Sequence, residues 1–263
     1  QWRNFRWTTN FTYSWNKNEI IELAANAVNP VTGEALNLTK LDIKGLGKAK
    51  YILKEGGTLG DLYTTSNLRF NDNGYVEVDK NGNLLMTDEG EDIYLGSVFP
   101  NHNLAWRNDF SYKGINLGVL FTARLGGVCY SATQANLDLY GVSEASAAAR
   151  DAGGVLINGR EMVDAQKWYQ AIGSQSGLPQ YYLYSATNVR LQELSLGYTF
   201  PRKWFRNKLG LTVSFVGRNL WMIYCKAPFD PEAVASTGLN YQGIDYFMMP
   251  SMRNLGFNVK FQF

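Results

Sequence analysis

The segment YLYSATNVRLQELSLGYTFP, residues 181–200, carries the pattern that decides the fold. From residue 193 onward, apolar residues alternate with small or polar ones at a period of two, which is the spacing of a β-strand with two unlike faces. Leu194, Leu196, Tyr198 and Phe200 share one face, and Glu193, Ser195, Gly197 and Thr199 share the other. Such a strand fits either a soluble sandwich with its apolar face inside or a membrane barrel with its apolar face outside.

Composition narrows the function classes. The chain has 263 residues, of which 45% are hydrophobic and 14% aromatic, and this fits one large β domain or two ordinary ones. A net charge of +2 gives no electrostatic reason to expect nucleic acid as a partner. No apolar run reaches the roughly 18 residues of a transmembrane helix, whereas a barrel strand needs only about 9–11. The chain opens at Gln1 inside a strand pattern and without a signal peptide, so we expect a fragment or a processed piece.

The same alternation recurs along the chain and predicts seven antiparallel strands. They lie near residues 3–16, 102–113, 115–128, 187–200, 208–222 and 250–263, with one more, of poor alternation, between 19 and 66. Short turns at Lys113-Gly114 and 202–208 alternate with long connections at about 66–101, 129–186 and 224–249. Because consecutive antiparallel strands alternate in direction, seven strands would place a turn at 16–18 at the same end of the sheet as the two short turns.

The two faces favour the barrel. A sandwich is expected to carry many Lys and Glu on its wetted face, but here that face holds Asn, Thr, Ser, Gly and Gln with a few Arg. On the apolar face, Trp, Tyr and Phe become more frequent toward the strand ends, as in the aromatic girdles of outer-membrane barrels. Arg107, Arg124 and Arg218 fall on lumen-facing positions, where they could pair with acids of a plug or contact a ligand. Arg190 precedes the part of its strand in which the apolar face alternates regularly, and would lie above it toward the outer rim.

These residues also carry a family resemblance. Together with 181–200, it rests on VSFVGRNLWMIY (213–224), DPEA (230–233), PSMRNLGFNVKFQF (250–263), GTLGDLY (57–63), residues 94–127 and NKNEIIEL (16–23). The chain resembles the C-terminal third of SusC-like (RagA-type) TonB-dependent outer-membrane transporters, over nearly its whole length and in the same order. Ser185, where the family often has Asp, and Leu62, where it often has an aromatic residue, are minor departures.

The resemblance implies an all-β fold in which residues 1–263 supply about the last seven strands of a 22-stranded transmembrane barrel, with long extracellular loops. It implies a Gram-negative outer-membrane protein that imports oligosaccharides or peptides, with no cofactor and no enzymatic activity. The implied partners are the N-terminal barrel and plug of the same transporter, a SusD-like surface lipoprotein, the TonB complex through the missing plug, and membrane lipid. Phe261 and Phe263 would form the C-terminal assembly signal. A passive porin-type channel and a soluble glycan-binding β domain remain the alternatives.

Motifs for other chemistry are weak. His102 is the only histidine, and it is expected to be solvated at a strand start. Cys129 and Cys225 lack the spacing of a zinc site but could form a disulfide at the outer rim. GLGKAK, residues 45–50, lacks the spacing of a phosphate-binding loop. Asp-Pro-Glu at 230–232 could bind a cation or, as we favour, order a loop.

The connection at 129–186 is too long to be passive, and we expect it to be functional. SEASAAARDAG, with Ser143 as N-cap, and REMVDAQKWYQAIG both predict short helices. Aromatic residues of the long loops are candidates for substrate or lid contact, or for holding the loops together. They are Tyr130, Tyr140, Trp168, Tyr169, Tyr181, Tyr182, Tyr184, Phe229, Tyr241 and Tyr246.

Overall fold

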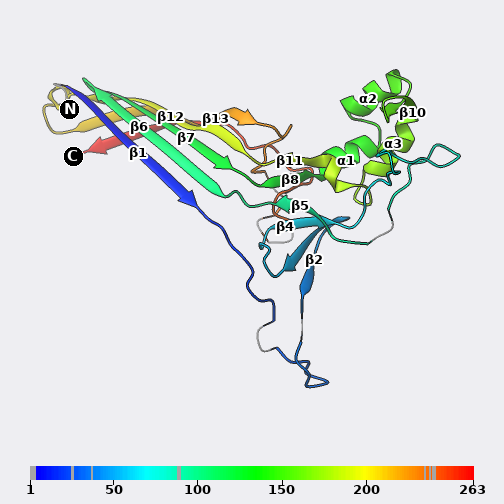
Figure 1. Cartoon of the computed structure of the whole chain (residues 1–263). Helices are drawn as coiled ribbons and strands as arrows, with labels where there is room; N and C mark the ends of the chain where they lie inside the picture. The colour runs from blue at the N-terminus through cyan, green and yellow to red at the C-terminus, as the bar shows by residue number, and fades with distance from the viewer. Residues whose placement is uncertain are drawn as a thin grey trace.

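The computed structural model describes residues 4–24, 27–36, 38–87, 90–233, 235–236, 238 and 241–263. Six long strands form one antiparallel sheet in the order β1-β6-β7-β12-β13-β15 (Figure 1). Their bounds are Phe5–Trp15 (β1), His102–Tyr112 (β6), Ile115–Leu125 (β7), Asn188–Phe200 (β12), Gly210–Cys225 (β13) and Asn254–Gln262 (β15). Each of these strands was predicted by the alternation, and Lys113-Gly114 and the segment after Phe200 are the short turns between them.

The prediction of a seventh strand in this sheet was wrong. β1 pairs directly with β6 over its full length, from Phe5 opposite Tyr112 to Trp15 opposite His102. Residues 16–18 therefore leave the sheet at the end opposite to Lys113-Gly114. The prediction that they turn at the same end as Lys113-Gly114 was also wrong. The intervening segment forms a separate four-stranded sheet of Lys40–Leu46 (β2), Ala49–Lys54 (β3), Asp61–Thr64 (β4) and Ile93–Ser97 (β5). Within GLGKAK, Gly47 adopts φ +61° in the tight connection of β2 to β3.

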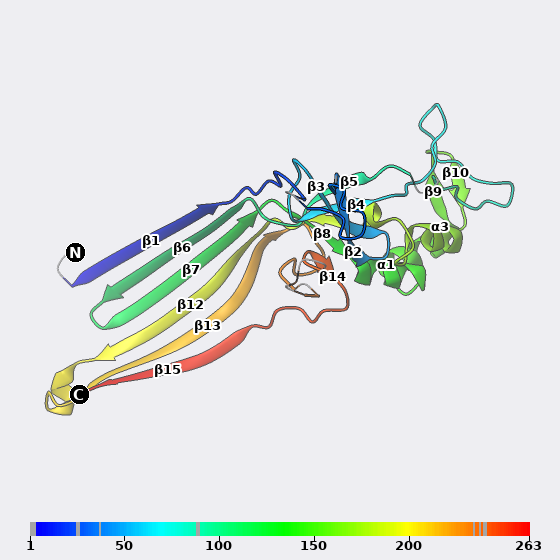
Figure 2. The ribbon, with the colours of Figure 1, turned by 90° about the horizontal axis from the view of Figure 1, so that it is seen from below.

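Three long connections, residues 16–101, 126–187 and 226–253, gather at one end of the large sheet (Figure 2), and we call their described residues the head. The elements of the second connection are Val128–Ser131 (β8), Ala132–Leu139 (α1), Glu144–Asp151 (α2), Val155–Ile157 (β9), Glu161–Val163 (β10), Ala165–Ile172 (α3), Pro179–Tyr182 (η1) and Leu183–Ser185 (β11). Ile244–Asp245 (β14) in the third connection pairs with β8, and Arg202–Phe205 (η2) lies in the short turn at the far end. None of the helices in the described ranges is long and apolar enough to cross a membrane.

Capping residues set where the three helices begin. Ser143 accepts a hydrogen bond from the Ser146 amide and caps α2, as the sequence predicted. Asp164 caps α3 through the Lys167 amide, so the second predicted helix begins at Ala165 and its first residues form β10 instead. Ser131 caps α1, a helix that was not predicted from the sequence.

One hydrophobic core holds the head together. Tyr51 and Leu62 of the first connection, Tyr130 and Leu178 of the second, and Ile244 of the third are buried in it. The Tyr51 hydroxyl also donates a hydrogen bond to the backbone carbonyl of residue 242, joining the first connection to the third. The head is therefore a single packed unit built from segments far apart in the sequence.

The large sheet has a bare apolar face. Leu196 is 54% exposed, Trp7 56% and Phe257 79%, and no described element covers them. Aromatic rings pair across neighbouring strands on this face, as Phe215 and Phe257 do with centroids 5.6 Å apart. A soluble sandwich would bury such a face against a second sheet, and none of the other sheets in the described ranges covers it.

Candidate functional site

Charged side chains cross the polar face of the large sheet. Glu193 on β12 accepts from Arg107 Nη1 of β6 at 3.2 Å and from Arg218 Nε of β13 at 3.0 Å, one arginine on each carboxylate oxygen. Arg107 also pairs with Asp109. Arg107 reaches Glu193 across β7 at Gly118, where a Cβ atom would lie 2.9 Å from Asp109 Oδ1. A glycine at this position leaves room for the ion pairs to cross the strand.

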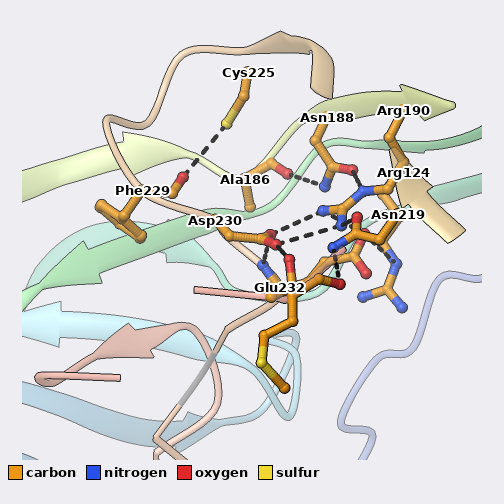
Figure 3. Close-up of polar contacts among 11 residues, drawn as sticks. Arg124, Ala186, Asn188, Arg190, Asn219, Cys225, Phe229, Asp230 and Glu232 are labelled. Atoms are coloured by element: carbon orange, nitrogen blue, oxygen red, sulfur yellow. Dashed lines mark hydrogen bonds and ion pairs between the residues drawn. The ribbon is translucent and has the colours of Figure 1, made fainter. Parts of the chain in front are cut away.

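A second charged cluster lies where the sheet meets the head (Figure 3). Arg190, near the start of β12, places Nη2 2.8 Å from Asp230 Oδ1 and 3.1 Å from Glu232 Oε1. Arg124 of β7 approaches the same Glu232 at 3.5 Å. The Arg190 side chain is only 4% exposed and that of Asp230 8%, whereas the Arg124 side chain is 51% exposed. We call Arg190, Asp230, Glu232 and Arg124 the rim cluster.

Hydrogen bonds complete the rim cluster. Arg190 Nε donates to Asn188 Oδ1 at 3.2 Å, and the Asp230 carboxylate accepts from the Ser251 hydroxyl and the Glu232 amide. Burial raises the pKa of Asp230, but the hydrogen bonds from Arg190, Ser251 and the Glu232 amide outweigh it and hold the pKa below its ordinary value. The Asp-Pro-Glu segment thus orders the third connection, and no metal-binding group of three His, Cys, Asp or Glu occurs among the described residues.

Arg107, Arg124 and Arg218, which were predicted to face the lumen, lie on the polar face of the sheet but in two separate clusters. Arg107 and Arg218 meet at Glu193, and Arg124 joins the rim cluster. The sequence did not reveal the carboxylates with which these arginines pair. Glu193 was visible only as a polar-face position, and Asp230 lies 40 residues from Arg190, a separation that no local pattern reports.

The candidate aromatic residues do not form one site. Tyr130 and Tyr182 are 1% and 3% exposed in the core, so we correct their predicted contact role to a packing role. Trp168 packs edge-on against Tyr181, and Phe229 packs against Tyr184, at 6.0 and 5.7 Å between centroids. The side chains of the remaining candidates reach the surface to different extents: Tyr140 (76% exposed), Tyr241 (41%), Tyr246 (40%) and the half-buried Tyr169.

The two cysteines are free thiols. Cys129 Sγ lies 3.6 Å from the Tyr184 carbonyl oxygen, and Cys225 Sγ lies 3.8 Å from that of Phe229. Burial raises the pKa of Cys129 to about 12. The disulfide that the sequence allowed is not formed in this structure.

The chain is similar to known outer-membrane receptors. No family model matches it. It is 25% identical to TonB-dependent receptor P3 of Formosa agariphila over 98% of the chain and 27% of that receptor, and 21% identical to TonB-dependent receptor P39 of the same organism over 98% and 28%. Among solved structures, it matches the RagAB peptide transporter with a TM-score of 0.59 and 19% identity over 99% of the chain, and the open-open state of the RagAB peptide importer with 0.62 and 18%.

These comparisons, with the bare apolar face, make the chain similar to outer-membrane β-barrel proteins. More particularly, they confirm the predicted resemblance to part of a SusC/RagA-like TonB-dependent transporter, and with it the outer-membrane localisation. The chain spans about a quarter of the length of the curated relatives that it matches.

Proposed function

We propose that this chain forms the C-terminal wall and outer loops of an active transporter that imports oligosaccharides or peptides across the outer membrane. A SusD-like surface lipoprotein would cover its outer end, and TonB would supply the energy through a plug outside this chain. The chain itself would catalyse no reaction. The observation that carries the proposal is the large sheet, which is bare and apolar on one face and ion-paired on the other.

The apolar face fits lipid. Exposed Leu196 and Phe257 would meet hydrocarbon, and Trp7 and the other aromatic residues toward the strand ends would lie at the interfaces. The ion pairs of Glu193 on the opposite face would line the lumen, where water or plug residues solvate charge. Arg107, Arg124 and Arg218 would then face the plug.

The sheet edges fit a wall that continues beyond this chain. Within the part of the chain that the structure describes, β1 and β15 each have only one neighbouring strand, and unpaired backbone groups cannot remain in hydrocarbon. Further strands of the same transporter would pair with both edges and close the barrel. Phe261 at the end of β15 and Phe263 beyond it would serve in assembly.

The head would form the outer entrance. It stands at one end of the sheet, opposite the short turns, as long outer loops do in barrels of this kind. Its core and capped helices make it a preformed platform for substrate or lipoprotein. The contact candidates that remain there are Tyr140, Trp168, Tyr169, Tyr181, Phe229 and Tyr241.

Replacing residues 142–163 with a Gly/Ser linker tests the role of the head. This change removes α2, β9 and β10 but keeps α1 and α3, which pack against one another. In the full-length transporter, we expect normal insertion, seen as a heat-modifiable band on gels, with loss of uptake or of lipoprotein association. The matched control replaces the turn 202–207 at the other end of the sheet and is expected to retain both.

Three results would contradict the proposal. Normal uptake with the lipoprotein still bound would limit the removed segment to a packing role. Uptake that persists without TonB or proton motive force would indicate a passive channel. Recovery of the protein in the soluble fraction without detergent would indicate a soluble domain.

A further inference from the structure

A cavity of about 410 Å³ opens between α1, α2 and α3 in the head, outside both charged clusters. Its volume falls within the roughly 300–1,000 Å³ of small-molecule sites. The residues of its lining that bear on a ligand are Asp138, Tyr140, Ser146, Arg150, Asp164 and Tyr169. All three helices contribute, so the cavity exists only when the second connection is folded.

Opposite charges line this cavity without pairing. Arg150, Asp138 and Asp164 form no ion pair with any described residue, although all three border the same space. A ligand group of opposite charge could therefore pair with each of them.

Each charged group is held by its own hydrogen bond. Arg150 Nη1 donates to the Gly141 carbonyl oxygen at 2.7 Å, Gln134 Nε2 donates to Asp138 Oδ1 at 2.9 Å, and the Lys167 amide donates to Asp164 Oδ1 at 3.1 Å. These bonds leave further donor positions on the guanidinium and a second oxygen on each carboxylate. The charged groups are therefore already oriented by hydrogen bonds before a ligand binds, which lowers the entropic cost of binding.

Asp138 most strongly indicates the ligand's charge. The residue is 4% exposed and has no cationic partner among the described residues, and a buried carboxylate is costly unless it is paired. Asp138 lines the cavity together with Tyr169, whose pKa is raised by burial and then by the negative charge of Asp138. A ligand ammonium would compensate this charge, whereas the hydroxyls of a neutral sugar would not.

We propose that the cavity binds the zwitterionic backbone of a short peptide, with its ammonium group toward Asp138 and Asp164 and its carboxylate toward Arg150. Arginine suits the carboxylate because its planar group can donate two parallel hydrogen bonds. The inference rests on the proposed function only in placing the head outside the membrane; binding itself does not require transport. It selects peptides over oligosaccharides as the ligand class of this site.

Calorimetric titration of the full-length protein in detergent tests the site, with the dipeptide Ala-Ala as probe. We expect Ala-Ala to bind, and we expect its N-acetylated, C-amidated form and the neutral disaccharide maltose not to bind. In Asp164→Asn and Arg150→Gln, the affinity for Ala-Ala should fall by about tenfold or more, since each variant loses a charge-assisted hydrogen bond. Asp151→Asn, an exposed acid of α2 outside the cavity lining, should bind like the wild type.

The variants are chosen to fold. Asn caps a helix as well as Asp does, so Asp164→Asn keeps the start of α3, and Asp138→Asn, which can still accept from Gln134, is the second acid variant. Circular dichroism and heat modifiability check each protein. The proposal is overturned if Ala-Ala does not bind the wild type, if folded Asp164→Asn and Asp138→Asn both bind it normally, or if the blocked dipeptide or maltose binds equally well.

Failure of this site and failure of the proposed function give different results. Absent Ala-Ala binding together with TonB-dependent uptake of another substrate would reject the site alone. Ala-Ala binding that depends on Arg150 and Asp164, together with a passive or soluble behaviour of the full-length protein, would reject the transporter alone.

Discussion

Arg190 and Asp230 form a buried ion pair, Nη2 to Oδ1 at 2.8 Å, between the head end of β12 and the connection that follows β13. Arg190 is on the same face of the sheet as Glu193, although the two are three residues apart, because the bulge between Leu191 and Glu193 adds one residue to β12; Arg190 lies opposite Thr122 and Glu193 opposite Leu120, which share a face of β7. The pair therefore fastens the third connection to the polar face of the wall, at the level where the head begins (Figure 3).

Replacing Arg190 with Gln should loosen this connection strongly. Removing one partner of a buried pair leaves the other charge uncompensated, at a cost of about 3–5 kcal/mol. Arg124→Gln is the matched control, because Arg124 contacts the same Glu232 but is half exposed, where an ion pair contributes at most about 1 kcal/mol. Urea unfolding in micelles and proteolysis of residues 226–253 measure both effects. Equal losses in the two variants would show that burial does not set the strength of the rim cluster.

The same pair predicts a dependence on pH. The pKa of Asp230 is lowered in the folded protein, so its contribution to stability is complete above the ordinary Asp pKa of about 3.9 and is lost as pH falls through the lower folded value. Proteolysis of residues 226–253 by an acid protease should accelerate below about pH 4. Asp230→Asn should remove this acceleration, and a variant that retains it would assign the pH dependence to another group.

The sequence predicted the six wall strands because their faces alternate over most of their length. It failed between residues 19 and 66, because β2, β3 and β4 are only 7, 6 and 4 residues long and both faces of β4 are buried, so a period of two does not show. Residues that were taken as one poor wall strand instead form three strands of the small sheet.

The candidate site was predictable only in part, for a similar reason. Arg107 and Arg218 could be assigned to the polar face from alternation within their own strands. The pairing of Arg190 with Asp230 depends on how the third connection folds back on the sheet, and the cavity depends on how three helices meet. Tyr130 and Tyr182 look like surface candidates in sequence because burial in the head is set by tertiary contacts.

Cys129 should resist alkylation in the folded protein. With its pKa raised to about 12, only roughly one thiol in ten thousand is ionised at pH 8, and the thiolate is the reactive form. In a Cys225→Ser background, maleimide labelling should be slow in detergent and fast after unfolding. The wild type should show both thiols after unfolding without reductant; thiols that appear only when reductant is added would show that the two cysteines are bonded.

The two faces of β13 should differ in their tolerance of charge. Val213 and Thr212 are neighbours on this strand, so their side chains point to opposite faces. Val213 pairs with Val259 and Tyr198 on the apolar face, whereas the Thr212 hydroxyl lies 3.1 Å from that of Thr199 on the polar face. Val213→Lys should destabilise the inserted protein by about 2–4 kcal/mol if it lies near the bilayer midplane, and Thr212→Lys should be tolerated because its charge would reach a polar lumen. Urea unfolding from lipid vesicles measures both, and equal costs would reject the orientation of the wall.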